Sequence, residues 1–524
     1  MRGHIMYNTS QSSQFMFRNA LWRYASKTAV VIGDRAYTYR ELDELSSHLA
    51  AHLADNGVVK QDKVAILLRN CIEYVITDLA IIKLGAVKVP LNEMLSMSDV
   101  SYMVGHSGAK AMMVHSSLTD KLNDAELAGS GLAHRLEVDD LGDGVKATHS
   151  DWGDLFTGDL HSFEWREVVP HDTALILYTG GTTGRPKGVM HSHGAMMINN
   201  LTHIVHGEIA EDEKLLLISP LPHAAGFFLQ TALLHGAMVY VQNKFDPETA
   251  LETISKSGIT WTFMVPTMIY RVLDAYDSNQ HNIASLRTLI YGAAPITKVR
   301  LREVLDKFGP VLLQIFGQTE VPNFATKLSK ADHFNDKFLG SCGQPVITCD
   351  VRIGDDNGES LPFGEVGEIM TRSPYTLDCY YNAPDKTAEV YAGQWVKTGD
   401  VGYQLDTGHV FIVDRSKDMI ISGGMNVYSS EVENVVQEFP GVRQVMVIGT
   451  PHEDWGEAVC AAVVPTDKGL DEKALIAFCK EKLAAYKVPK TIEIVEEIPL
   501  TAYGKPDKKA LRVKYWGDQT RQVN

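Results

Sequence analysis

The chain has 524 residues and a formal net charge of −16 at pH 7, with 45% hydrophobic and 22% charged residues. The length predicts more than one folding unit, roughly three by the usual domain size, and the composition is that of an ordinary globular protein. The negative charge argues against nucleic acid or an anionic membrane as a bulk partner, because like charges repel.

Cysteine content and the terminal segments indicate a reducing compartment. The six cysteines are scattered and include no C-x-x-C pair, which argues against a disulfide framework or a metal cluster and fits the cytoplasm. The N-terminal segment lacks the apolar core of a signal peptide, and the final Gln-Val-Asn is not a peroxisomal address. The longest apolar stretch, around 74–91, contains Asp78, Lys83 and Lys88, so we expect no integral membrane segment.

The first part of the chain predicts layered α/β structure. Short apolar runs at 64–68, 86–90 and 111–114 predict buried strands, and the stretch 74–83 predicts a helix. Such alternation is typical of parallel sheets covered by helices. The same alternation of strand-like and helix-like segments recurs at 213–241 and 260–295, where 261–265 and 286–291 are strand-like.

The most informative segment is a loop of small, hydroxylated and basic residues that follows an apolar run at 174–178. Glycines let backbone N–H groups approach a ligand, and threonine hydroxyls add donors, so the loop is suited to the phosphates of a nucleotide. The Walker pattern is not met, because Pro186 precedes Lys187 and Gly188 follows it. An ordinary surface turn is the alternative for a motif this short.

The last third predicts a change of architecture. Asp-Thr-Gly at 406–408 predicts the turn of a hairpin within 398–415. Charge then gathers at 414–418, and a compact α+β pattern follows, with strands at 444–449, 458–464 and 492–495 and a helix at 471–484. We place a domain boundary near Ser416.

Residues 177–188, Leu-Tyr-Thr-Gly-Gly-Thr-Thr-Gly-Arg-Pro-Lys-Gly, resemble the phosphate-binding signature of the adenylate-forming superfamily. This superfamily includes acyl-CoA synthetases, luciferases and the adenylation domains of peptide synthetases. Gly180 replaces the usual serine, which removes one hydroxyl but no backbone donor. The resemblance covers essentially residues 20–515. It implies an α/β fold with a large N-terminal domain (1–415) of layered α/β subdomains plus a distorted β-barrel, and a small mobile α+β C-terminal domain (416–524).

Adenylation joins a carboxylate to ATP with loss of pyrophosphate, so its site needs a divalent cation, hydrogen-bond donors and a lysine. Residues 317–320, Gly-Gln-Thr-Glu, resemble the superfamily's G-x-T-E motif, in which Thr319 contacts a phosphate and Glu320 helps to hold Mg²⁺. A glutamate alone is more often a solvated surface carboxylate. Phe316 stands where many relatives carry tyrosine and would stack on adenine, although a core aromatic residue is physically similar.

Further residues resemble the parts of the superfamily that hold the nucleotide. Asp400, in Trp-Val-Lys-Thr-Gly-Asp, matches the carboxylate that accepts both ribose hydroxyls, and Arg415 matches an arginine that reaches the same ribose. An isolated Thr-Gly-Asp is more often a plain turn. The residues expected to bind ATP or AMP are Thr179, Gly180, Gly181, Thr182, Thr183, Gly184, Lys187, Gly292, Ala293, Ala294, Pro295, Gln314, Ile315, Phe316, Gly317, Asp400, Arg415 and Lys505.

Three C-terminal features resemble functional elements of the mobile C-terminal domain in the superfamily. Lys417 matches the hinge position, Lys505 in Pro-Leu-Thr-Ala-Tyr-Gly-Lys-Pro matches the catalytic lysine, and Ser422, Gly423 and Gly424 match the loop beside the CoA tunnel. Adjacent glycines would admit a thin ligand arm. Without the motifs, both lysines would be read as solvated surface charges.

The acyl pocket has the weakest sequence signal. His223, in Pro-Leu-Pro-His-Ala-Ala-Gly, resembles the aromatic gate, although a lone histidine is more often a core or surface residue. Ala224 and Ala225 stand where amino-acid-activating relatives carry an aspartate for the substrate ammonium, so an uncharged acyl or aryl tail fits better. The expected lining residues are His223, Phe227, Met264, Val265, Tyr291, Gly292 and Gln318, a largely apolar set.

These resemblances imply an AMP-forming acid–CoA ligase that uses ATP, Mg²⁺ and CoA to activate a fatty, aromatic or alicyclic acid. The alternatives are an adenylating enzyme that loads a carrier protein, a luciferase-like enzyme, and a nucleotide-binding protein without catalysis. The sequence determines neither the acid nor the oligomeric state, and it leaves a homodimer open.

Overall fold

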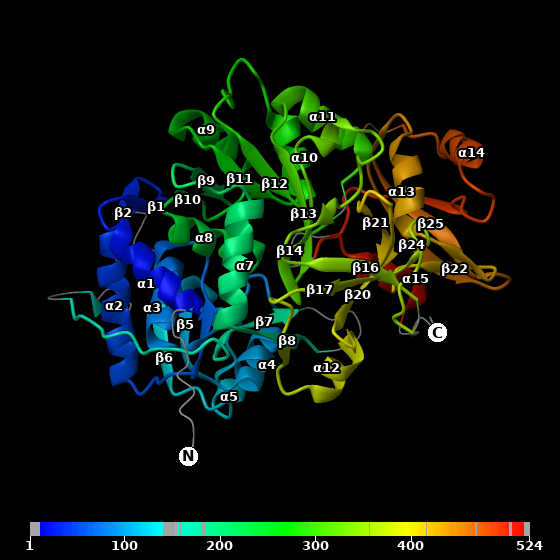
Figure 1. The fold of residues 1–524 in the computed structure, drawn as a ribbon. Coiled ribbons are helices and arrows are strands. Elements are labelled where there is room, and N and C mark those ends of the chain that lie inside the picture. Colours follow the sequence, from blue (N-terminus) through cyan, green and yellow to red (C-terminus); the bar gives the residue numbers. More distant parts are fainter. Residues whose placement is uncertain are drawn as a thin grey trace.

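The computed structural model describes residues 11–139, 152, 155–156, 160–179, 185–294, 296–355, 357–415, 417–466, 469–501 and 506–517. Two large sheets form most of the N-terminal body, and a smaller α/β unit at the C-terminal end carries the orange and red segments of Figure 1. The α/β architecture, with a large N-terminal and a small C-terminal part, is confirmed.

The first sheet has nine strands in the order β15-β14-β13-β12-β11-β9-β10-β1-β2. Neighbours from β13 to β1 are parallel, and the strands at both edges are antiparallel. In that order the strands are β15 (Gln344–Pro345), β14 (Val321–Leu328), β13 (Leu312–Gln318), β12 (Thr288–Tyr291), β11 (Trp261–Met264), β9 (Lys214–Leu217), β10 (Met238–Val241), β1 (Thr28–Ile32) and β2 (Arg35–Thr38).

The second sheet has seven strands in the order β18-β8-β7-β4-β3-β5-β6. Neighbours from β7 to β6 are parallel, whereas β8 and β18 are antiparallel additions. Its strands are β18 (Cys379–Tyr380), β8 (Lys187–Ser192), β7 (Thr173–Thr179), β4 (Val87–Pro90), β3 (Lys63–Leu67), β5 (Ala109–His115) and β6 (His134–Val138).

The helices of the N-terminal body cover these sheets, and several of them lie between the sheets (Figure 1). Every residue of α3 (Ile72–Leu84) is buried, in keeping with apolar side chains on all of its faces, and its charged residues Asp78 and Lys83 are paired with Lys88 and Asp43. The other helices here are α1 (Ser13–Arg23), α2 (Tyr39–Asp55), α4 (Met97–Ser107), α5 (Asp124–Leu127), α7 (His193–His206), α8 (Ala224–His235), α9 (Pro247–Ser257), α10 (Pro266–Ala275), α11 (Lys298–Phe308) and α12 (Pro384–Val390).

A third sheet, of five antiparallel strands, precedes the C-terminal unit in the chain, and it is the described part of the N-terminal domain that corresponds to the expected distorted β-barrel. Its strands are β16 (Asp350–Gly354), β17 (Gly367–Arg372), β19 (Tyr391–Ala392), β20 (Trp395–Gln404) and β21 (Val410–Arg415). The expected hairpin at 398–415 is the pair β20 and β21. Its last strand ends at Arg415, directly before the expected domain boundary.

The C-terminal unit packs three helices around a fourth sheet, which has its own apolar core. The strands are β22 (Ile420–Ser422), β23 (Met425–Val427), β24 (Val442–His452), β25 (Gly456–Pro465) and β26 (Thr491–Ile494), and the helices are α13 (Ser429–Gln437), α14 (Glu472–Lys482) and α15 (Lys508–Trp516). These bounds lie within a few residues of those expected from the pattern.

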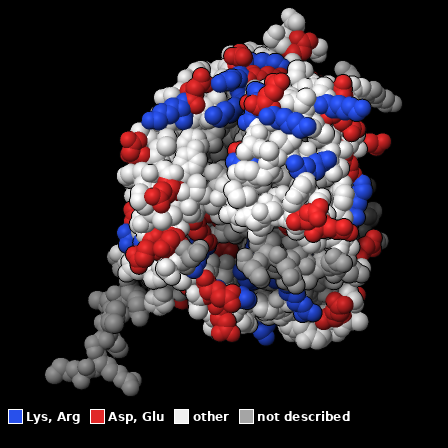
Figure 2. Space-filling view, turned by 90° about the vertical axis from the view of Figure 1, so that its right-hand side faces the viewer, with Lys and Arg blue, Asp and Glu red and all other residues white. Residues whose placement is uncertain are grey.

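Within the described part of the chain, no helix has the length and apolar character needed to cross a bilayer. On the coloured part of the face in Figure 2, basic and acidic side chains are intermixed rather than gathered into separate fields.

Candidate active site

The glycine-rich loop connects two antiparallel strands. Thr179 ends β7, Lys187 begins β8, and the two residues are paired in the register of the hairpin. A strand therefore begins at Lys187, where a Walker loop would lead into a helix, in agreement with the absence of the Walker pattern from the sequence. Five residues expected to bind phosphate lie outside the described residues: Gly180, Gly181, Thr182, Thr183 and Gly184.

Thr319 and Glu320 form the tip of a tight hairpin between β13 and β14, because Gln318 pairs directly with Val321. Gly317 makes this hairpin possible: a Cβ atom there would lie 2.6 Å from the backbone of Asn323. The backbone carbonyl of Glu320 accepts a hydrogen bond from the Leu377 N–H at 2.8 Å. The G-x-T-E motif is thus held on a rigid turn with its carboxylate side chain at the tip.

The Glu320 carboxylate lies in a small cluster with an aromatic hydroxyl and a lysine. The Tyr380 Oη donates to Glu320 Oε1 at 2.7 Å, and the Lys187 Nζ lies 4.3 Å from the centre of the Tyr380 ring. Burial lowers the pKa of Lys187, the charge of Glu320 opposes this shift, and the charge of Lys417 adds to it. Lys187, Glu320 and Lys417, which are far apart in sequence, therefore share one electrostatic environment.

Tyr380 and His191 were not expected at the site. Tyr380 lies on the two-residue strand β18, beside β8, and His191 on β8 has its Nε2 2.8 Å from the Thr319 carbonyl oxygen. Burial lowers the pKa of His191 to about 4, so at neutral pH the ring is uncharged and its Nε2–H donates to that carbonyl. No local pattern marks either residue, because both contacts cross from one sheet to the other.

Asp400, expected at the ribose, is 5% exposed. It faces Arg415 across the β20–β21 register, and the Arg415 Nε lies 3.3 Å from Asp400 Oδ1. The Gln318 Nε2 donates to Asp400 Oδ2 at 2.7 Å and to the Thr398 carbonyl at 2.8 Å. The Gln318 amide, expected in the acyl pocket, is therefore bound to the ribose motif in this structure.

The expected adenine wall follows β12. A Cβ at Gly292 would lie 2.5 Å from the Ile315 carbonyl oxygen, so packing against β13 already requires glycine there. Ala293 has a φ of 67°, a left-handed conformation that is uncommon for alanine, and Pro295 lies outside the described residues. Phe316 is 8% exposed and belongs to the largest core cluster, so core packing and adenine stacking both remain compatible with it.

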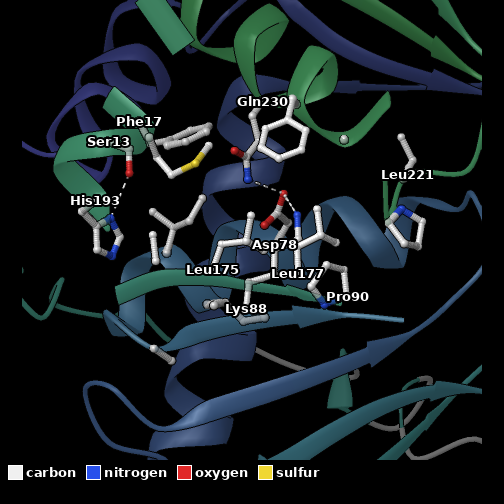
Figure 3. Close-up of a pocket in the computed structure, with 18 of the residues that line it drawn as sticks. Ser13, Phe17, Asp78, Lys88, Pro90, Leu175, Leu177, His193, Leu221 and Gln230 are labelled. Atoms are coloured by element: carbon white, nitrogen blue, oxygen red, sulfur yellow. Dashed lines mark hydrogen bonds and ion pairs between the residues drawn. The ribbon is translucent and has the colours of Figure 1, made fainter. Parts of the chain in front are cut away.

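Only part of the expected acyl lining comes together. His223 and Phe227 line a cavity between α1, α3, α7, α8, β4 and β7, where Leu175 and Leu177 form part of the wall (Figure 3). The described residues that line this cavity do not include Met264, Val265, Tyr291, Gly292 or Gln318. Tyr291 is fully buried elsewhere, with its hydroxyl 2.9 Å from His333 Nε2 and 3.3 Å from Gln314 Oε1.

His223 has a defined partner at the N-terminus of α8. The Asn92 Oδ1 accepts from the Met94 N–H at 2.8 Å, which assigns the other end of this amide as the donor. The Asn92 Nδ2 then donates to His223 Nε2 at 2.8 Å. The imidazole at the expected gate is thus held as an Nε2 acceptor.

The expected CoA loop is a two-glycine hairpin turn between β22, which ends at Ser422, and β23. Gly423 and Gly424 have φ values of 59° and 78°, the left-handed conformation that a two-residue type I′ turn requires. No described atom lies within 4 Å of a Cβ built on Gly424. Turn geometry alone accounts for both glycines, and the open space beside Gly424 leaves room for a ligand arm.

Lys505, expected to be catalytic, lies outside the described residues. The residues that flank this segment are described: Leu500 and Pro506 form an antiparallel bridge, and the Asp507 N–H donates to the Pro499 carbonyl at 2.8 Å. The described residues on either side of 502–505 therefore lie beside one another on the C-terminal unit, next to α15.

Comparison with known proteins identifies the class. The model of the AMP-binding enzyme family matches residues 17–381, and that of the AMP-binding enzyme C-terminal domain matches 431–505. A feruloyl-CoA synthase of Amycolatopsis sp is 37% identical over 93% of this chain and 96% of its own. Medium/long-chain-fatty-acid–CoA ligase FadD8 of Mycobacterium tuberculosis is 35% identical over 96% and 90%. ATP-bound MatB from Rhodopseudomonas palustris superposes with a TM-score of 0.88 at 28% identity, over 97% and 100%.

The chain belongs to the AMP-binding enzyme family, in the acid–CoA ligase branch of the adenylate-forming superfamily. It is an ATP-dependent, AMP-forming acyl-CoA synthetase, with ATP, CoA and a carboxylic acid as its substrates.

Proposed function

We propose that the enzyme activates a carboxylic acid with an uncharged acyl or aryl tail, in the cytoplasm, through a site centred on the hairpin of Gln318, Thr319 and Glu320. One observation supports this most directly: neighbouring residues of a single hairpin reach the expected ribose carboxylate on one side and the expected phosphate lysine on the other. The Gln318 side chain donates a hydrogen bond to Asp400. Tyr380 contacts both Glu320, through its hydroxyl, and Lys187, through its ring. The free thiols of the six cysteines fit a reducing compartment.

Mg²⁺ fits the donor set around Glu320. Among the described residues, no group of three or more histidine, cysteine, aspartate or glutamate side chains could hold a metal ion. One carboxylate on a rigid turn nevertheless suits Mg²⁺, which usually binds through one or two carboxylates together with substrate phosphates and water. Glu320 would hold the ion beside Thr319, and the bound ion would neutralise charge on the triphosphate.

In the first half-reaction, an oxygen of the acid attacks the α-phosphorus of ATP and pyrophosphate leaves. Asp400 would accept the ribose hydroxyls, with Arg415 and Gln318 fixing its carboxylate. Lys187 would bind a phosphate and Lys505 the developing negative charge, because preorganised cations stabilise charge that appears in the transition state.

In the second half-reaction, the CoA thiol attacks the acyl-adenylate and AMP leaves. We propose that the C-terminal domain turns about Lys417 between the two steps, which withdraws Lys505 and presents Gly423 and Gly424 beside the thiol arm. The separate sheet and core of the C-terminal unit and the space beside Gly424 support this proposal.

The relatives bear the names of fatty-acid, feruloyl, indoleacetate and 2-succinylbenzoate ligases. Ala224 and Ala225 follow the histidine at the expected gate, and neither can bind an ammonium group. We therefore expect fatty, aromatic or alicyclic acids rather than α-amino acids as substrates.

Two assays with the full chain test the proposal. ATP-dependent pyrophosphate release should occur with medium-chain, aromatic or alicyclic acids, and thioester should form when free CoA is added. Pyrophosphate release without thioester would favour a carrier protein as acceptor. No pyrophosphate release with any of these acids would contradict the proposed substrate class.

A further inference from the structure

The cavity beside His223 and Phe227 contains a charged group in its wall. The Asp78 side chain on α3 is 4% exposed, and its Oδ2 pairs with the Lys88 Nζ of β4 at 2.8 Å. The same oxygen accepts from the Gln230 Nε2 of α8 at 2.9 Å. Figure 3 shows this trio in the middle of the cavity, between Ser13 and His193 at one end and Leu221 at the other.

The second oxygen of this carboxylate has unused bonding capacity. Asp78 Oδ1 is buried and has no hydrogen-bond partner among the described residues. Leaving a buried acceptor unsatisfied destabilises the protein, and more so when the group is charged. Because Asp78 lines the cavity, a molecule in the cavity can supply the missing donor.

The net charge of Asp78 and Lys88 determines which kind of hydrogen-bond donor on a ligand fits Asp78 Oδ1. Lys88 already neutralises Asp78, and the Lys88 ammonium also lies 5.1 Å from the centre of the Tyr74 ring. A second cation would leave a net buried charge, and a second carboxylate would be repelled by Asp78 at short range, so both are costly. A neutral O–H or N–H group fits best.

The three polar residues Asp78, Lys88 and Gln230 line the same cavity as His223, the residue at the expected gate. His223 precedes the first residue of α8, and Gln230 lies seven residues further along the chain. At 1.5 Å per residue, this separation is about 10 Å along the helix. The cavity wall also contains the apolar side chains of Leu175, Leu177 and Phe227, which suit the hydrocarbon tail of an acid.

We propose that this cavity receives the tail of the acid substrate, and that Asp78 selects tails with a neutral hydrogen-bond donor at the far end, such as a terminal or phenolic hydroxyl. The inference rests on the proposed acid class and narrows it. A hydroxyl that replaces a methyl group or hydrogen at that end should raise kcat/KM about ten- to a hundredfold, the effect expected of a hydrogen bond to a charged acceptor.

The test compares matched acids with the full-length wild-type enzyme: octanoic with 8-hydroxyoctanoic acid, decanoic with 10-hydroxydecanoic acid, and cinnamic with 4-hydroxycinnamic acid. Pyrophosphate release reports activation. The hydroxylated member of at least one pair should be preferred at least tenfold, and the corresponding dicarboxylic acids should be poor substrates. Equal use of both members of every pair overturns the inference but not the proposed function, whereas no activation of any acid overturns the proposed function.

Variants assign the preference to this carboxylate. The double variant Asp78→Leu/Lys88→Met replaces a buried ion pair by apolar side chains, a change that is often tolerated. It should abolish the preference while the unsubstituted acids are still activated. Asp43→Asn is the matched control, because it disrupts another lysine–aspartate pair of α3, Lys83 with Asp43, outside the cavity lining, and it should keep the preference.

A cavity-filling variant tests the tail position independently of the ion pair. Leu175→Phe should lower kcat/KM for decanoic acid at least tenfold more than it lowers kcat/KM for acetic or propionic acid. Retention of the hydroxyl preference in the double variant, or an equal effect of Leu175→Phe on decanoic acid and the short acids, overturns the inference. If the double variant does not fold, the matched acid pairs with the wild-type enzyme and the Leu175→Phe variant still test the inference.

Discussion

The side-chain amide of Gln318 donates a hydrogen bond to the Asp400 carboxylate over 2.7 Å. This bond joins the strand before the expected metal-binding turn to the strand that carries the expected ribose ligand. The same Nε2 also donates to the Thr398 carbonyl, so the position of Asp400 depends on β13 as well as on its own hairpin.

Gln318→Leu should raise the KM for ATP by about tenfold or more, because a hydrogen bond to a charged group contributes roughly 1.5–3 kcal/mol. The KM for the acid should change little if the amide acts only through Asp400. Asp400→Ala should have a larger effect, and the double variant should be less than additive because both changes remove one shared interaction. Steady-state kinetics with ATP varied at saturating acid provides the measurement.

Gln344→Leu is the control for this experiment. Its exposed amide, on β15, donates to the carbonyl of Thr407 in the turn between β20 and β21, away from Asp400, and its loss should leave the KM for ATP unchanged. Fully additive effects of Gln318→Leu and Asp400→Ala would show that the two residues act separately.

Tyr380→Phe should slow adenylate formation about tenfold, because it removes the hydroxyl that donates to Glu320 but keeps the ring beside Lys187. Single-turnover pyrophosphate release measures the effect. Tyr381→Phe is the control, since that neighbouring ring lies against His106. Equal rates for Tyr380→Phe and the wild type would mean that the orientation of Glu320 does not depend on this hydroxyl.

Lys505→Ala should lower adenylate formation by roughly two to four orders of magnitude, the scale for loss of a main electrostatic stabiliser. Thioester synthesis from added acyl-adenylate should be much less affected, because we propose that Lys505 has left the site by then. An equal loss in both half-reactions, with the fold retained by circular dichroism, would rule out the alternating mechanism.

Lys417→Pro should prevent the hinge from turning, because proline restricts φ to about −65°. Adenylation should largely survive and thioester synthesis should collapse, so a burst of pyrophosphate with retained acyl-adenylate is expected. Gly424→Leu should give the same signature by another route, since leucine is strained at a φ of 78° and its side chain would occupy the space beside the turn. Normal acyl-CoA turnover by Lys417→Pro would place the hinge elsewhere.

The buried histidine at the Thr319 turn should make stability depend on pH. Burial lowers the pKa of His191 from 6.5 to about 4, so between these values the unfolded state binds the proton and the folded state does not. Its contribution to stability is complete above pH 6.5 and declines by up to about 1.4 kcal/mol per pH unit as the pH falls toward 4. His191→Gln, which keeps an N–H donor for Thr319, should reduce that slope by about one proton in urea unfolding followed from pH 7 to 4. An unchanged slope would contradict the burial effect.

Much of the fold could be predicted because short stretches of apolar and polar residues indicate where individual strands and helices form. Apolar runs at 64–68 and 261–265 predicted strands that the structure has at Lys63–Leu67 and Trp261–Met264. The length and apolar character of the stretch 74–83 predicted helix α3. The domain boundary near 416 and the roles of the site residues stay predictions, supported by the separate C-terminal sheet and by the positions of Asp400 and Glu320.

The sequence by itself determined the class of enzyme and the positions of several strands and helices, because motifs, turn glycines and side-chain periodicity depend on residues close together in the chain. Only the tertiary structure decided that Gln318 bonds to Asp400, that Tyr380 and His191 support the Thr319–Glu320 turn, and that Asp78 lies in the cavity beside His223. Each of these contacts joins residues on different elements. Their distances depend on strand register and on how two sheets pack, and neither leaves a periodic signal in the sequence near the residues concerned.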